Sequence, residues 1–338
     1  MSTDTLADVL ASVRLTGAVY FDLECAPPWI AEAPASSVVA RHVMPAADHV
    51  LEFHAITRGH CVGGILGEEP VRLEAGDVLC FPHGDPHVLS SAPGMKPPGV
   101  DLAPYRRPGM TFPFSLKLGT GEADAHVVCG FLGCSTRPFN PLLASLPRVL
   151  RASDHDGSPG GRLAGFVALL AAEMGSERPG KEAVLARLSE LMFVEVVRRH
   201  LEALPPERTG WLSGLRDPHV GKALAALHAR PGDPWTLEAL AGEAGLSRSA
   251  LAERFSALVG EPPMQYLARW RMQVAAELLT TTHDGIAGIG ARVGYASEAA
   301  FNRAFKKLVG VPPATWRRQR RSEPATRVQR AHDPDDRA

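Results

Sequence analysis

The chain has no run of 18 apolar residues, the length that a membrane-spanning helix needs. Its first residues, MSTDTLADVLASVRL, carry acids where a secretory signal peptide carries basic residues. Five cysteines, an odd number, are spread from Cys25 to Cys134, which is unlike the disulfide framework of a secreted protein. We therefore expect a cytoplasmic protein with reduced thiols and no membrane partner.

The sequence also lacks the short motifs of several common enzyme classes. It contains no GxSxG, no HExxH, no phosphate-binding loop and no GxGxxG placed between a strand and a helix. Nucleophilic hydrolysis, zinc proteolysis and nucleotide chemistry therefore have no support, and we predict that the protein is not an enzyme.

Charge is divided unevenly along the chain, although its sum is only -1. Residues 215–321 hold 15 Lys and Arg against 9 Asp and Glu, a balance of +6, whereas residues 1–214 hold 18 against 24, a balance of -6. Clustered cations supply the salt-dependent part of DNA affinity. The basic C-terminal third therefore favours double-stranded DNA as a partner.

This basic third contains a duplication. One copy, LAGEAGLSRSALAERFSALVGEPP, starts at Leu240, and the other, IGARVGYASEAAFNRAFKKLVGVPP, starts at Ile289. When the copies are aligned, Gly260 falls on Gly310, an offset of 50 residues. A period of this size marks a repeated structural unit.

Each copy predicts a helix, a tight turn and a second helix. Gly245 and Gly294 would end the first helices, and Ser247 and Ser297 would N-cap the second ones. Apolar residues at helical spacing would close a small core in each copy. A long amphipathic helix, roughly Met264–Thr280, would join the two helix-turn-helix units at a fixed distance.

The other face of each second helix is polar and would reach DNA from the major groove. Arg248, Ser249, Asn302 and Arg303 lie in the first two turns, where recognition helices meet base edges. Arg254, Lys306 and Lys307 lie later and would contact phosphate. The predicted DNA-binding residues are Ser247, Arg248, Ser249, Glu253, Arg254, Ser297, Glu298, Asn302, Arg303, Lys306 and Lys307.

These residues resemble the AraC/XylS-type transcriptional regulators over roughly Asp217 to Arg318. The most specific parts are VGYASEAAFNRAFKK, the Gly-x-Pro-Pro ends at Gly260 and Gly310, and YLARWRM. The resemblance implies a promoter-binding module of two helix-turn-helix units, with RNA polymerase as a partner if the protein is an activator. The second copy departs from this pattern in its first helix, which is rich in glycine: Gly285, Gly288 and Gly290. Each interior Gly destabilises a helix by about 1 kcal/mol relative to Ala.

The N-terminal half predicts a β-sandwich or barrel. Residues 17–34 begin with alternating apolar residues, and short strand-like runs follow: SVVARHVM, VLEFHAIT, HCVGGILG and EPVRLEAGDVLCFP. A Pro- and Gly-rich connection is expected over residues 94–125. The stretch LEAGDVLCFPHGDPHVL, Leu73 to Leu89, resembles the second half of a cupin motif. With its neighbours it is similar to the cupin-type sensor domain of one branch of the AraC family, which holds an effector or mediates dimerisation.

Histidines and cysteines in this half suggest a binding site. We predict effector contacts from His54, His83, His87 and Cys129, and the weaker metal candidates are His83, His87, Cys129 and Cys134. Zinc would accept such a set of ligands. A cupin metal site, however, requires a His-x-His and a Glu in the first motif. This sequence has only His49 and His54 there. No cofactor is assigned. Thiol sensing, purely structural roles for these residues, and a metal-dependent cupin oxygenase fused to a DNA-binding module stay open as alternatives.

Over residues 162–204 the apolar residues recur at helical spacing, which predicts a helical hairpin. Its second helix has a wide apolar surface, which either packs within its own chain or forms a homodimer seam: Val184, Leu185, Leu188, Leu191, Met192, Val194 and Val197.

The sequence thus predicts an α+β protein in five segments. They are a cupin-like sensor domain (1–155), a helical hairpin for dimerisation (160–205), a linker (206–216), a double helix-turn-helix domain (217–320) and a disordered tail (321–338). The predicted function is a sequence-specific transcriptional regulator, one-component and effector-responsive. The alternative is a ligand-independent regulator whose β domain only dimerises.

Overall fold

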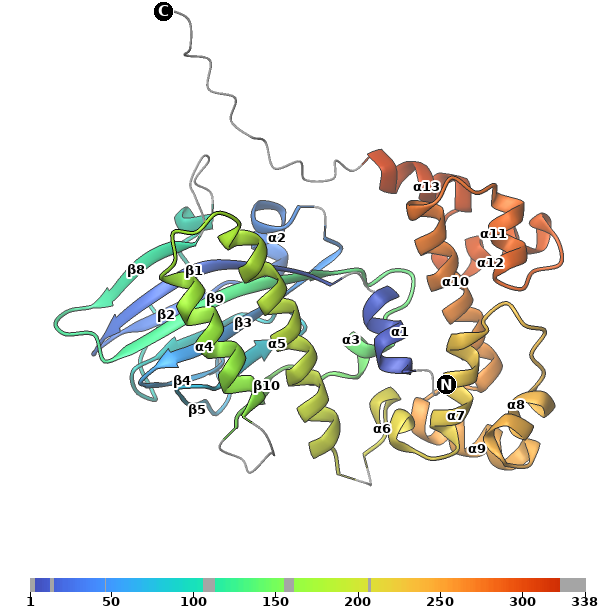
Figure 1. Cartoon of the computed structure of the whole chain (residues 1–338), viewed down its shortest axis with the longest axis horizontal. Helices are drawn as coiled ribbons and strands as arrows, with labels where there is room; N and C mark the ends of the chain where they lie inside the picture. The colour runs from blue at the N-terminus through green and yellow to red at the C-terminus, as the bar shows by residue number, and fades with distance from the viewer. Residues whose placement is uncertain are drawn as a thin grey trace, which may run out of the picture.

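The computed structural model describes residues 4–12, 15–45, 47–105, 113–154, 161–205 and 208–322. Most of the expected disordered tail therefore lies outside the described residues. A β-rich N-terminal part and an all-helical C-terminal part lie at opposite ends, with helices α1 (Thr5–Ser12) and α3 (Pro141–Ser145) between them (Figure 1). The predicted α+β class is confirmed.

Two facing sheets form the N-terminal part. The six-stranded sheet has the order β10-β6-β3-β9-β1-β8, and the four-stranded sheet has the order β2-β7-β4-β5. One set of apolar residues is buried between the sheets, as expected of a cupin-like sandwich. The strands are β1 (Thr16–Ala26), β2 (Ile30–Ala33), β3 (His49–Arg58), β4 (His60–Ile65), β5 (Val71–Glu74), β6 (Val78–Phe81), β7 (His87–Ser90), β8 (Phe114–Gly119), β9 (Ala125–Cys134) and β10 (Leu150–Ala152).

One expected strand is a helix. SVVARHVM forms α2 (Ser36–Val43), so the prediction of a strand there is wrong. The paired valines favour a strand by propensity, but the buried positions are Ser36, Val39 and Val43. That spacing of three and four residues fits one face of a helix packed on β3, and tertiary packing overrides the local preference.

The connection over residues 94–125 contains more structure than expected. It includes the short 3-10 helix η1 (Ala103–Tyr105) and strand β8, which pairs in parallel with β1 through registers such as Leu23 with Leu116. Part of this connection therefore becomes the edge of the larger sheet.

The predicted helical hairpin is present as α4 (Arg162–Met174) and α5 (Lys181–Ala203). It covers the outer face of the six-stranded sheet, in front of it in Figure 1. Leu185, Met192 and Val197 are buried within the chain. Part of the wide apolar surface thus packs within its own chain, while Val184 and Leu191 remain exposed.

The C-terminal part is all helical, and both predicted helix-turn-helix units are present. Its helices are α6 (Trp211–Arg216), α7 (Val220–Ala229), α8 (Leu237–Ala244), α9 (Arg248–Val259), α10 (Pro263–Thr281), α11 (Ile286–Arg292), α12 (Glu298–Val309) and α13 (Pro313–Ser322).

Helix α10 joins the units by belonging to both cores. Tyr266 and Trp270 are buried with the residues of α7 to α9, whereas Met272 and Leu279 are buried with those of α11 to α13. A helix of 19 residues is about 28 Å long. Because each end is embedded in a separate core, α10 fixes the spacing of the two units.

The glycine-rich helix α11 is explained by packing. A Cβ on Gly290 would lie 3.0 Å from the Cβ of Phe301, closer than ordinary contact. The absence of a side chain therefore lets α11 approach α12, which offsets part of the lost helix propensity.

The segment expected to be a linker, residues 206–216, is helical in its second half, where it forms α6. Trp211 is buried there, and its indole Nε1–H donates to the Tyr266 hydroxyl at 2.8 Å. The same hydroxyl lies 2.7 Å from His228 Nε2, and the His228 ring stacks on Trp270. Helix α6 is thus part of the first unit's core and not a spacer.

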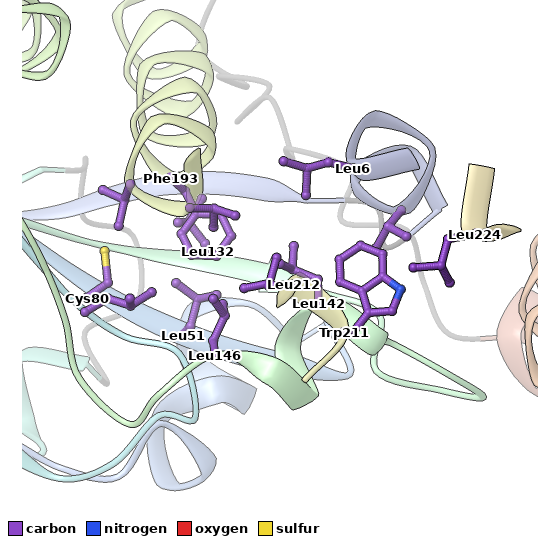
Figure 2. Packing of buried hydrophobic residues seen from close by; sticks show 14 of the residues in the cluster. Leu6, Leu51, Cys80, Leu132, Leu142, Leu146, Phe193, Trp211, Leu212 and Leu224 are labelled. Carbon is purple, nitrogen blue, oxygen red and sulfur yellow. The ribbon is translucent and has the colours of Figure 1, made fainter. Parts of the chain in front are cut away.

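One continuous apolar cluster joins the six-stranded sheet to the first helix-turn-helix unit (Figure 2). Leu51 and Leu132 come from the outer face of β3 and β9, Leu142 from α3, and Trp211 and Leu212 from α6.

Polar contacts reinforce this junction. The Phe139 backbone N–H donates to Gln273 Oε1 at 3.1 Å, and Arg320 on α13 pairs with Asp48 beside β3. The two parts are therefore packed together and not only tethered.

Candidate functional site

The two recognition helices, α9 and α12, are built by the same local devices. Gly245 and Gly294 end the preceding helical segments with φ of 69° and 85°, a left-handed conformation that glycine adopts without strain. The Ser247 and Ser297 hydroxyls accept the backbone N–H of the third following residue. The predicted caps are confirmed, and they fix where each polar face begins.

The structure places most of the predicted DNA-binding side chains in solvent. Arg248, Ser249 and Glu253 on α9 are exposed, as are Glu298, Arg303, Lys306 and Lys307 on α12, and Asn302 is half-buried. The opposite faces carry Leu251, Phe255, Phe301 and Phe305, all fully buried. Each helix is therefore fixed by its apolar face and presents its polar face outward.

Arg254 differs from the other predicted contacts. Its Nε and Nη2 atoms donate to Asp217 Oδ2 at 2.8 and 2.6 Å. Asp217 also accepts the backbone N–H groups of His219 and Val220 at the start of α7. This arrangement supports a role for Arg254 in orienting α9 against α7.

The two polar faces are not equivalent in charge. Helix α12 carries Arg303, Lys306 and Lys307 against Glu298, whereas α9 carries Arg248 and the paired Arg254 against Glu253. Within the described residues, the polar face of α12 therefore carries more positive charge without an ion pair than the polar face of α9 does.

A second constellation lies between the two sheets of the N-terminal part. Glu52 and His54 are two residues apart on β3 and so point to the same side of the strand. His54 faces Cys129 across the β3–β9 ladder, and His87 comes from β7 of the opposite sheet. All four side chains are buried.

These groups form a hydrogen-bonded chain. His87 Nδ1 donates to the Asp85 carbonyl oxygen at 2.7 Å, which leaves its Nε2 as an acceptor. His54 Nε2 lies 2.6 Å from that Nε2, and His54 Nδ1 lies 2.9 Å from the Cys129 sulfur. The Ser36 hydroxyl donates to Glu52 Oε1 at 2.9 Å.

Burial makes the neutral form of each group the stable one. It raises the pKa of Glu52 to about 8, against a smaller lowering by the Ser36 hydroxyl. It lowers the pKa of His87 to about 4, and burial together with the neighbouring His87 lowers the pKa of His54. The pKa of Cys129 is raised by burial as well. The site therefore holds four polar groups without net charge at neutral pH.

A cavity of about 170 Å³ opens above this cluster. Glu52, His54, His87 and Cys129 line it, together with residues of η1 and of the loop before η1. The remaining lining includes the acidic residues Glu32 and Asp101 but is largely apolar or aromatic: Phe21, Leu23, Ala31, Leu89, Pro98, Pro104, Tyr105, Leu116, Leu118 and Phe131. The arrangement suits a small ligand with an apolar body and one polar end.

The structure separates the predicted effector and metal residues. His54, His87 and Cys129 meet at the cavity, but His83 is exposed and its Nε2 bonds to the Leu146 carbonyl oxygen. Cys134 lies at the far end of β9 and does not line the cavity. The proposed sets containing His83 and Cys134 are therefore not assembled.

Sequence reasoning missed Glu52, Tyr105 and Ser36. The spacing Glu52-x-His54 on a strand was the available signal for Glu52, because residues two apart share a face. Nothing in the order of residues indicated that η1 would place Tyr105 at the cavity.

Comparison with known proteins identifies the family. A Cupin family model matches residues 4–202, more than half of the chain, and a Helix-turn-helix domain model matches residues 240–319. The chain belongs to the AraC-like transcriptional regulators that carry an N-terminal cupin domain. It is a DNA-binding transcriptional regulator of this family, as the sequence predicts.

Two curated relatives match this chain over most of its length and support the family assignment. A putative AraC-like transcription regulator of Streptomyces lividans is 35% identical, over 80% of this chain and 88% of its own length. The regulator AlkR of Acinetobacter baylyi is 28% identical, over 94% of this chain and 99% of its own. The DNA-binding domain of AdpA, solved with a target DNA, is 28% identical and covers 33% of this chain and 99% of its own, with a TM-score of 0.31. Among helices of the described residues, none has the length and apolar character that crossing a bilayer requires.

Proposed function

We propose that the chain is a one-component, sequence-specific regulator that works as a homodimer in the cytoplasm, where promoter DNA lies. The observation that carries this proposal is the pair of capped helices α9 and α12, whose polar faces are exposed on units joined by α10. The two helices would enter successive major grooves on one side of the DNA, about 34 Å apart. RNA polymerase would be a further partner if the regulator activates.

The sensor function is proposed for the cavity between the sheets. A dry cavity of about 150 Å³ is enough to hold a molecule the size of benzene, and this one measures about 170 Å³. A small, mostly apolar effector with one hydrogen-bonding group fits its lining. We propose no catalytic reaction, because binding alone can shift the DNA-competent population if the effector prefers one state.

The dimer surface is proposed along the helical hairpin. Val184 and Leu191 are 43% and 50% exposed and lie seven residues apart on one side of α5, and Leu169 on α4 is 57% exposed. Large apolar side chains in solvent favour burial against a second copy. Sedimentation of the free protein at micromolar concentration would report the dimer directly.

Selection of bound fragments from a random DNA pool tests the function. We expect one enriched motif spanning nearly two turns for each subunit, present twice in each fragment if the protein is a homodimer. A repeat of the selection with small-molecule extracts should change the yield if the cavity holds an effector. Failure to enrich any motif at low salt would contradict sequence-specific binding, and single motifs would contradict the homodimer.

Replacement of Arg303 by Ala should weaken binding to the selected motif. Arg303 is exposed, and within the described residues it forms no hydrogen bond or ion pair. A bidentate contact to guanine is worth about 1–3 kcal/mol, so Kd should rise and preference at one base pair should relax. Fluorescence anisotropy with matched and single-mismatch duplexes measures both.

Arg292→Ala is the matched control for charge. Arg292 belongs to the same unit but lies on α11, where it pairs with Asp284 at 2.8 Å. We expect it to change affinity little and specificity not at all. An equal loss for Arg303→Ala on every duplex would make Arg303 a phosphate contact instead.

A further inference from the structure

The cavity between the sheets is lined by acidic side chains and, among the described residues, by no Lys or Arg. The acids come from three separate segments: Glu32 from β2, Glu52 from β3 and Asp101 from the loop before η1. An apolar effector with one hydrogen-bonding group makes no use of this bias. A cleft whose charges have one sign attracts ligands of the opposite sign. The lining therefore favours a positively charged effector.

Glu32 and Asp101 supply the negative charge. Asp101 is exposed and Glu32 is half-buried, so both carboxyl groups reach solvent. Glu32 Oε2 accepts the Gly99 backbone N–H at 3.0 Å, and Asp101 Oδ1 accepts the Ala103 backbone N–H at 2.8 Å. Within the described part of the chain, neither acid forms an ion pair. Their charges are therefore held in place without being neutralised.

Glu52 adds a buried polar atom that has no partner. Its side chain is 2% exposed, and its Oε1 accepts the Ser36 hydroxyl at 2.9 Å. Its Oε2 lies 3.7 Å from His87 Nε2, which is beyond hydrogen-bond length, and forms no hydrogen bond with any described residue. An unpartnered buried polar atom raises the free energy of the empty cavity. A positive group beside Glu52 would favour the carboxylate and give Oε2 a partner.

Three aromatic rings line the same cavity. The Tyr105 ring lies 5.3 Å from the Phe21 ring and 6.3 Å from the Phe131 ring, with interplanar angles of 81° and 68°. Burial raises the pKa of Tyr105, and the nearby Glu52 and Asp101 raise it further, so rings and acids share one space. The electron-rich face of an aromatic ring attracts cations, and groups of such rings recognise alkylated ammonium ions.

We propose that this cavity binds a small alkylammonium ion as its effector. The inference rests on the proposed sensor function of the cavity, and it names the class of ligand. The positive group would lie among Glu32, Asp101 and the three rings, and the alkyl part would contact the apolar walls. The volume of about 170 Å³ is sufficient, since about 150 Å³ already holds benzene. An anion of the same shape would meet only acidic groups among the described lining residues.

The first experiment titrates the wild-type full chain with three probes at low salt. Tetramethylammonium, tert-butanol and pivalate have similar shapes but are positive, neutral and negative. Each gives a sharp methyl proton signal, and broadening of that signal on the protein reports binding. We expect tetramethylammonium to bind with Kd of about 1 mM or below. tert-Butanol should bind at least about tenfold more weakly, and pivalate should not bind.

The outcomes separate this proposal from the others. Equal affinity for tetramethylammonium and tert-butanol would overturn it, because recognition would then depend on shape alone. It would be equally wrong if pivalate bound more tightly, or if no probe were broadened. Binding of tert-butanol alone would still support an apolar effector. No readout uses DNA, so a failure to bind DNA leaves the ammonium site standing.

The second experiment removes charge from the lining. Glu32→Gln and Asp101→Asn each keep an amide oxygen that accepts the same backbone N–H, but they lose the negative charge. Each should weaken tetramethylammonium binding by about 3- to 10-fold. Glu24→Gln is the matched control, because Glu24 pairs with Lys117 at 3.4 Å and does not line the cavity. An equal loss in Glu24→Gln would reduce the effect to general surface charge and contradict the site.

The third experiment tests the ring at Tyr105. Tyr105→Phe keeps the aromatic face and should change Kd for tetramethylammonium less than about twofold, whereas Tyr105→Leu should raise it by about 5- to 30-fold. Similar losses in both variants would mean that the hydroxyl and not the ring binds the ligand. Circular dichroism reports whether each variant folds. If Tyr105→Leu does not fold, the comparison of the three probes on the wild type still decides.

Discussion

Replacement of Phe305 by Ala is expected to lower the free energy of unfolding of the second helix-turn-helix unit by about 3–5 kcal/mol. Phe305 is fully buried between α12 and the rest of its unit. Its ring meets Phe301 edge-on at 5.6 Å and Trp316 at 6.1 Å. Removal of the ring leaves a cavity that a unit built from three short helices and one end of α10 can close only in part.

The effect should reach DNA binding, because α12 is positioned by this core. Urea denaturation measures the stability loss, and anisotropy with the selected duplex measures the binding loss. Leu308→Ala, on the same helix at a side chain that is 42% exposed, should cost less than about 1 kcal/mol. Similar losses for the two variants would mean that the described core does not hold α12.

Acid should destabilise the first unit through His228. Burial lowers the pKa of His228 to about 3, whereas an unfolded histidine titrates near 6.5. The folded state thus favours the neutral ring. This contribution to stability is complete above pH 6.5 and is lost as the pH falls from 6.5 towards 3, by at most about 1.4 kcal/mol per pH unit.

The test compares the wild type with His228→Gln at pH 7, 6 and 5. Glutamine does not titrate, and its carbonyl can still accept a hydrogen bond from the Tyr266 hydroxyl. Urea denaturation followed by tryptophan fluorescence is suitable, since Trp211 and Trp270 flank the ring. The stability of the wild type should fall faster with acid than that of the variant. Parallel pH profiles would show that His228 does not titrate on unfolding.

Much of the DNA module could be predicted from the sequence because its signals are local. The turn glycines, the serine caps and the apolar spacing of Leu251 with Phe255 act within one or two helical turns. The repeat supplied an independent check, since two copies of one pattern are hard to produce by chance. Local signals did not reveal that Arg254 is paired with Asp217, 37 residues away.

In the cupin-like N-terminal domain, by contrast, long-range contacts override several local signals. SVVARHVM has the composition of a strand, yet packing on β3 makes it helix α2. His83 and His87 are close in sequence, and only His87 reaches the cavity, because β7 begins there and turns its side chain between the sheets.

The sequence by itself determined the class of this protein, its helix-turn-helix repeat and the polar faces of the two predicted recognition helices, because helices and caps depend on neighbours along the chain. Tertiary structure alone decided which side chains line the cavity between the sheets. Glu52, His54, His87 and Cys129 come from strands of two sheets, and the pairing of those strands depends on long-range contacts that no local pattern specifies.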